Sequence, residues 1–86
     1  MRFQGSVIKE QGVTFAIAIV KPHVLNSSIE ASKAIRSFTP IFGFVPVILM
    51  AQDHGGTPTW YGRRDIVQFL KNVPLSAIPW KEYTLN

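Results

Sequence analysis

The sequence predicts a single small α+β domain over residues 1–86, in which a four-stranded mixed sheet carries two helices on one face. Three observations support this fold class. Two apolar runs rich in β-branched residues, 13–20 and 44–50, are typical of buried strands. Apolar residues recur at helical spacing in two other segments, 31–38 and 66–73. A chain of 86 residues has room for one hydrophobic core only.

The first part of the chain is expected to form a hairpin. Residues 3–8 alternate weakly between apolar and polar side chains, as a strand does. The polar segment 9–12 ends in glycine and has the right length for a hairpin loop. Residues 13–20 are apolar on both faces, which predicts a central strand that ends before Pro22.

A helix is expected between Ser27 and Thr39. Ser27 and Glu30 have the spacing of a capping box, in which each side chain accepts a hydrogen bond from the backbone of the other residue. Pro40 disfavours helical geometry at Thr39, so the helix should end there.

The second part of the chain is expected to add a strand, a helix and a short edge strand. Proline cannot donate to a strand ladder, so Pro46 belongs at the start of its strand or at a sheet edge. A polar loop is expected over 51–62, followed by a helix of about ten residues around 66–73. A last strand is expected over 78–85. This order leaves one sheet face without a helix, and we expect a second copy, another partner or a ligand to cover it.

Composition bounds the compartment and the partners. The chain has no cysteine, which favours a reducing compartment, the cytoplasm, and excludes disulfides. Its longest apolar run, 13–20, is far shorter than the roughly 20 residues that a membrane helix needs, so no membrane contact is expected. The net charge of +4 comes from scattered basic residues and suits an anionic partner only weakly.

The segment 52–65 is the most chemically varied part of the chain and is our candidate ligand site. Loops carry function more often than cores do, and a helix start offers free N–H groups to an anion. In this interpretation two arginines contact an anion, an imidazole titrates nearby and two aromatic rings stack on the ligand. The candidate residues are Asp53, His54, Trp60, Tyr61, Arg63 and Arg64.

The same segment has a purely structural interpretation, which stays open. Gly55 and Gly56 favour a turn, and Thr59 or Gly62 could cap the following helix. Asp65 suits the positive end of a helix dipole.

The sequence does not indicate a metal, a cofactor or a catalytic residue. The two histidines, His23 and His54, have no acidic residue at helical ligand spacing. There is no serine elbow, and Gly55-Gly56 lacks the Gly-Lys-Ser/Thr of a phosphate-binding loop. We therefore do not predict an enzyme.

One stretch, Thr14–Pro22, resembles the opening strand of nucleoside diphosphate kinases, which leads into a Lys-Pro pair. The following helix and the strand at Gly43-Phe44 extend the resemblance over part of the chain. The resemblance implies that Lys21 corresponds to a phosphate-contacting lysine. The chain lacks the Asn-x-x-His-Gly-Ser-Asp motif of that family, so the resemblance does not predict a kinase.

We predict a binding or interaction module that forms a homodimer and has no evident catalytic activity. Trp60 and Trp80 offer large contact areas that suit an interface, and a small domain gains stability from a partner. One alternative is a small basic nucleic-acid-associated protein that uses Arg63 and Arg64 with Trp60 and Tyr61. The other is a protein that binds a small anion or phosphate ligand through residues 53–64.

Overall fold

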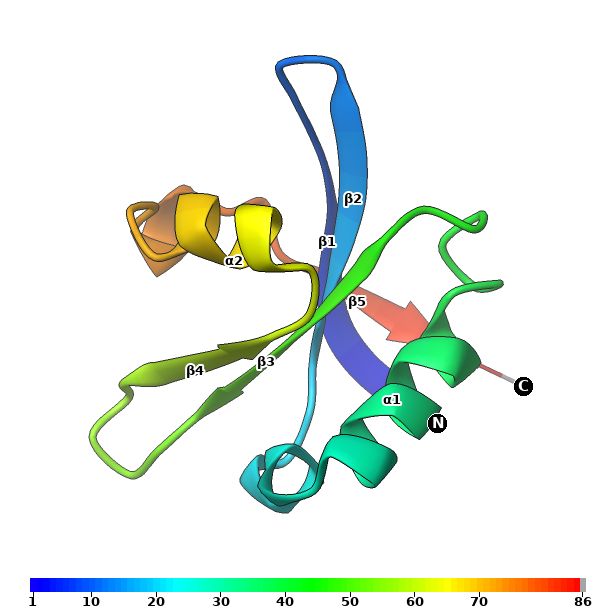
Figure 1. Cartoon of the computed structure of the whole chain (residues 1–86), viewed down its shortest axis with the longest axis vertical. Coiled ribbons are helices and arrows are strands. Elements are labelled where there is room, and N and C mark those ends of the chain that lie inside the picture. The colour runs from blue at the N-terminus through cyan, green and yellow to red at the C-terminus, as the bar shows by residue number, and fades with distance from the viewer. Residues whose placement is uncertain (86) are drawn as a thin grey trace.

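The computed structural model describes residues 1–85, which form a five-stranded mixed sheet in the order β4-β3-β2-β1-β5 (Figure 1). The β2–β3 pair is parallel and the other pairs are antiparallel. The α+β class is confirmed. The strands are β1 (Arg2–Glu10), β2 (Val13–Ile19), β3 (Val47–Gln52), β4 (Pro58–Tyr61) and β5 (Lys81–Thr84). The helices are α1 (Ser28–Phe38), α2 (Arg64–Leu70) and the 3₁₀ turns Pro22–Asn26 and Leu75–Ala77.

The prediction of four strands is wrong, because the segment expected to be a polar loop contains β4. This strand has only four residues and begins with a proline, so it lacks the alternating pattern that identifies longer strands. It lies at the edge of the sheet beside β3. Pro58 fits there because the first residue of an edge strand can do without an N–H donor. The last strand, β5, forms the opposite edge, as expected.

The two central strands are buried on both faces. Side chains alternate along a strand, so each of these strands contributes to two cores. In β2, Ala16 and Ala18 belong to one apolar cluster, while Ile17 belongs to the other. In β3, Leu49 belongs to the same cluster as Ala16 and Ala18, and Ile48 belongs to the cluster of Ile17. All five residues are fully shielded from solvent.

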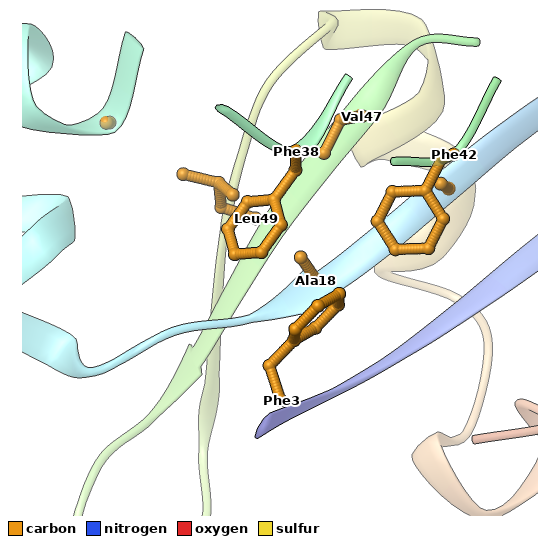
Figure 2. Close-up of a cluster of buried hydrophobic side chains, with 8 residues drawn as sticks. Phe3, Ala18, Phe38, Phe42, Val47 and Leu49 are labelled. Atoms are coloured by element: carbon orange, nitrogen blue, oxygen red, sulfur yellow. The ribbon is translucent and has the colours of Figure 1, made fainter. Parts of the chain in front are cut away.

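The first core lies between the sheet and α1 and is rich in aromatic rings (Figure 2). Phe3 of β1 packs against Phe38 at the end of α1, with ring centroids 4.8 Å apart. Phe42 and Tyr83 complete the group at centroid distances of 5.9 Å and 5.1 Å from Phe3. The rings join β1, β5 and the end of α1 into one apolar unit.

The second core lies on the opposite face of the sheet, under α2 (Figure 1). Ile66 and Leu70 of α2 pack there with Phe15 from β2, and the segment after the helix adds Ile78. The prediction that both helices cover one face is therefore wrong. Since β2 and β3 are apolar on both faces, helices on a single face would leave one row of their large side chains in water.

The ends of both helices follow from local chemistry. The Ser27 hydroxyl accepts a hydrogen bond from the Glu30 N–H (3.4 Å), which is half of the expected capping box. Thr39 ends α1 by donating its N–H and its hydroxyl to the Ile35 carbonyl. The second helix has seven residues and is shorter than predicted, because the chain turns at Leu70, where the carbonyl accepts from the Val73 N–H.

The β1–β2 hairpin extends beyond its neighbours in the sheet (Figure 1). Strand β5 pairs only with residues 2–5 of β1, and β3 pairs only with residues 16–19 of β2. The hairpin closes through Gln11 (φ 50°) and Gly12 (φ 80°), the two positive φ angles that a tight two-residue turn needs. The predicted hairpin is confirmed, although its turn is shorter than expected, because Lys9 and Glu10 belong to β1. The distal part of the hairpin has strand neighbours only within itself.

The variant Gly5→Ala should lower the free energy of unfolding by about 1–3 kcal/mol, because the site has no room for a methyl group. A Cβ at Gly5 would lie 2.6 Å from the Ile17 carbonyl oxygen and 3.1 Å from the Phe42 ring. Urea unfolding measures the change. The matched control is Gly55→Ala, whose Cβ meets nothing closer than 3.4 Å and which should change stability by less than about 0.5 kcal/mol. Equal effects of the two substitutions would contradict this account of the core.

Candidate functional site

The acidic start of the candidate segment builds the turn between β3 and β4. The Asp53 carboxylate accepts hydrogen bonds from the N–H groups of Gly55 and Thr57, both at 2.9 Å. The Gln52 side chain donates to the Gly56 carbonyl (3.0 Å) and closes the same turn. This geometry agrees with the structural interpretation of the glycine pair. His54 is exposed in this turn.

The two aromatic residues of the segment face opposite sides of the sheet. Trp60 packs against the core under α2, whereas Tyr61 packs against the core under α1. Successive residues of a strand point to opposite faces, so this separation follows from the presence of β4. The expectation that the two rings stack together on one ligand is therefore wrong.

The first arginine is engaged in an ion pair. Arg63 donates from Nε and Nη2 to the two carboxylate oxygens of Asp65, both at 2.8 Å. The hydrogen bond and the charge of Asp65 raise the pKa of Arg63 above its ordinary value. The same hydrogen bond lowers the pKa of the Asp65 carboxyl. Arg63 also occupies the N-cap position of α2, which the sequence analysis had assigned to Thr59 or Gly62.

Gly62 serves the packing between β4 and α2. Its φ of +151° is a conformation that other residues rarely adopt, and a Cβ there would lie 2.6 Å from the Ile48 side chain. A glycine is thus required where the chain passes close to the second core. Close packing therefore explains why the residue before the two arginines is a glycine.

Arg64 lies in a shallow groove with a second cation. The groove runs along one side of α2, and Arg64 opens that helix while Lys71 follows its end. Both cations are exposed. The groove is lined by Trp60, Tyr61, Gly62, Arg64, Val67, Gln68 and Lys71. Of the six candidate residues, Trp60 and Arg64 line this groove, and Tyr61 borders it although its ring packs on the other side of the sheet. Asp53 and Arg63 bond elsewhere, and His54 lies in the β3–β4 turn.

A second surface, not predicted from the sequence, lies at the distal end of the β1–β2 hairpin. We call Val7, Val13 and Phe69 the hairpin surface, and they are 46%, 39% and 39% exposed. Val13 and Phe69 lie on the α2 side of the sheet, whereas Val7 lies at the edge of β1 with its side chain on the α1 side. Phe69 of α2 lines two adjoining hollows, one shared with Val13 and the other with Val7. The helical spacing of Phe69 suggested a core position, and its ring does pack against Phe15 of β2, with centroids 6.4 Å apart, although the residue stays partly exposed.

The remaining ionisable groups provide no metal centre in the described part of the chain. Within residues 1–85, no cluster of three or more His, Asp or Glu side chains has the geometry to hold a metal ion. Lys21, the residue named by the kinase resemblance, is exposed and lines a hollow with Arg2 and Gln52. None of the helices in residues 1–85 is long and apolar enough to span a membrane.

Comparisons with known proteins assign no family to the chain. No protein-family model, curated protein or solved structure gives a significant match. The resemblance of residues 14–22 to one strand of nucleoside diphosphate kinases thus has no support from a family match. Function has to be argued from the geometry of the two surfaces.

The Asp65 carboxyl should titrate below its ordinary pKa of 3.8, and the variant Arg63→Gln should return that pKa toward 3.8. Because the folded-state pKa is lowered, the ion pair stabilises the fold above the ordinary pKa. That contribution disappears as pH falls through the lowered value. Carboxyl ¹³C chemical shifts measured over a series of acidic pH values follow the titration. The control Arg64→Gln should leave it unchanged, and a wild-type Asp65 that titrates at 3.8 or above would contradict the ion pair.

Proposed function

We propose that this chain is an interaction module that associates with a second copy of itself through the hairpin surface. The observation that carries the proposal is the grouping of Val7, Val13 and Phe69 around hollows at the free end of the hairpin. Burial of such apolar side chains on association contributes about 25 cal/mol per Å² removed from water. We propose no catalytic residue.

The reason for self-association differs from the one that the sequence suggested. The sheet face that was expected to be uncovered is occupied by α2 and by the segment that follows it. Part of the apolar surface that remains lies instead where the hairpin extends past its neighbours. Other exposed apolar residues lie near the N-terminus or at the two ends of α1: Met1, Ile29, Ile41 and Phe44.

The size of the domain also supports a partner. A domain of 86 residues buries a smaller fraction of its surface than a larger one, so its stability margin is narrow. Association stabilises the folded state by mass action. We place this module in the cytoplasm, since a small cysteine-free chain is suited to a reducing compartment.

The variant Val7→Lys should raise the dimer dissociation constant by on the order of tenfold or more, because it adds a second cation next to Lys9 at the contact. The matched control is Ile29→Lys, which changes an exposed apolar residue on α1 in the same way and should leave association unchanged. Both residues are exposed, so both variants should keep their stability within about 0.5 kcal/mol. Sedimentation velocity over a range of concentrations measures the constants.

A wild-type chain that stays monomeric at high concentration, on the order of 1 mM, would contradict the proposal. So would equal weakening by Val7→Lys and Ile29→Lys, because that result would point to charge in general as the cause.

As a second candidate, we propose that the groove along α2 binds single-stranded nucleic acid. The specific observation is that Arg64 and Lys71, both exposed, border a groove that is also lined by Trp60. Cations can hold phosphates there while an aromatic ring meets a base. The net charge of +4 favours the same partner. Arg63 has no part in this version, because it pairs with Asp65.

Fluorescence anisotropy with a labelled single-stranded oligonucleotide tests the second candidate. The double variant Arg64→Ala, Lys71→Ala should lower the slope of log affinity against log salt by about 1.4, from about 0.7 for each cation removed. The control Lys33→Ala, Arg36→Ala removes the same charge from α1 and should change the slope less. No binding by the wild type at low salt would exclude this function.

A further inference from the structure

The distal part of β1 has a free backbone edge. The Ala16 N–H donates to the Pro46 carbonyl (2.8 Å), so Ala16 directs its backbone groups toward β3. Val7 lies opposite Ala16, and in an antiparallel pair it must therefore direct its own N–H and C=O to the other side, away from β2. Lys9, opposite Thr14, does the same. The pairing with β5 stops at Gly5, so in residues 1–85 no strand bonds this edge at Val7 and Lys9.

A hollow runs beside this edge. It is bordered on one side by β1 and on the other by α2 and the segment that follows it. Phe69, Val73 and Ile78 supply an apolar wall. An unpaired strand edge beside an apolar wall is the setting in which an added strand is bound: its backbone groups give affinity and its side chains give specificity.

We propose that two copies of the chain pair antiparallel through residues 7–9 of β1, with Ile8 at the two-fold axis. This inference deepens the proposed self-association and rests on it. In this register Val7 of one copy lies opposite Lys9 of the other, and each such pair exchanges both backbone hydrogen bonds. The contact is isologous, so both copies contribute the same segment and the assembly closes as a dimer.

The neighbouring registers are excluded by residues in the chain. An axis at Val7 would place Lys9 opposite Gly5, whose edge is already occupied by Lys81 of β5. An axis at Lys9 would place two lysines directly opposite each other, which is unfavourable. The axis at Ile8 uses both free residues of each copy and avoids like charges, because Val7 then faces Lys9. Pairing ends there, since the Ser6 hydroxyl donates to the Pro79 carbonyl and Lys81 pairs with Gly5. This self-complementarity is the reason for choosing a second copy as the occupant.

Disulfide cross-linking tests the register directly, because the natural chain has no cysteine. In the proposed dimer the Ile8 residues form a non-hydrogen-bonded pair, with Cβ atoms about 4.5–5.5 Å apart, close enough for a disulfide. The variant Ile8→Cys should therefore cross-link on the order of tenfold faster than Val7→Cys, whose Cβ atoms are diagonal and about 7 Å apart. Exposure alone would predict the opposite order of cross-linking rates, since Val7 is more exposed than Ile8. Val13→Cys, on the other strand, should cross-link slowest.

Charge substitutions at Val7 provide a second test that leaves Ile8 intact. In the proposed register residue 7 faces Lys9 of the other copy. Val7→Glu should therefore keep the dimer dissociation constant within about twofold or lower it, whereas Val7→Lys should raise it on the order of tenfold. An apolar contact in any other register predicts that both charges weaken association to a similar extent.

The outcomes separate this inference from the function on which it rests. A wild-type dimer in which Val7→Cys or Val13→Cys cross-links as fast as Ile8→Cys would overturn the register and leave self-association standing. A monomeric wild type would overturn both. A monomer whose Val7 and Lys9 amides become protected when an extended peptide is added would assign the edge to a different partner and overturn the proposal.

Discussion

The parallel pairing of β2 and β3 is the constraint on which the rest of the structure depends. Each strand is apolar on both faces, so the pair is stable only when both faces are covered. α1 covers the side of Ala18 and Leu49, while α2 and the segment to Ile78 cover the side of Ile17 and Ile48. The short helix α2 suffices because the following residues complete its layer. β1 and β4 extend the sheet on either side of this pair.

The candidate interaction surface is a consequence of unequal strand lengths. β1 has nine residues, but β5 has only four and pairs with the first part of β1. Beyond Gly5 the edge of β1 therefore has no strand beside it within residues 1–85, and Phe69 lines the hollow next to this edge. Lys9 and Glu10 place charges on this edge, and charges discourage indiscriminate strand addition. An unpaired strand edge that carries charges favours a partner strand whose charges complement it in one register.

The fold could be predicted from sequence where long, regular patterns determine it. The double-sided apolar pattern of 13–20, the capping serine at 27 and Pro40 identified β2 and both ends of α1. β4 was missed, because four residues that begin with proline carry no periodic signal. The placement of the helices was wrong, although the apolar residues on both faces of β2 and β3 already required cover on both sides.

The candidate site was harder to predict than the fold. The residues of 52–65 are close in sequence, but a turn, a strand and a helix direct their side chains apart, and only the tertiary arrangement reveals this. Asp53 bonds within its turn and Arg63 is paired with Asp65. Composition alone does not show that these two side chains are already engaged and so less able to contact a ligand. The hairpin surface had no signal in the sequence, because it depends on where β5 stops along β1.

Backbone amide exchange at increasing protein concentration tests the central claim most directly. The N–H groups of Val7 and Lys9 point to the free edge, whereas the Ile8 N–H points toward Phe15 of β2. The account predicts that the Val7 and Lys9 amides exchange quickly in dilute solution and become protected as the chain associates, while the Ile8 amide is protected throughout. Exchange at Val7 and Lys9 that stays fast at concentrations where the chain is dimeric would contradict pairing through this edge.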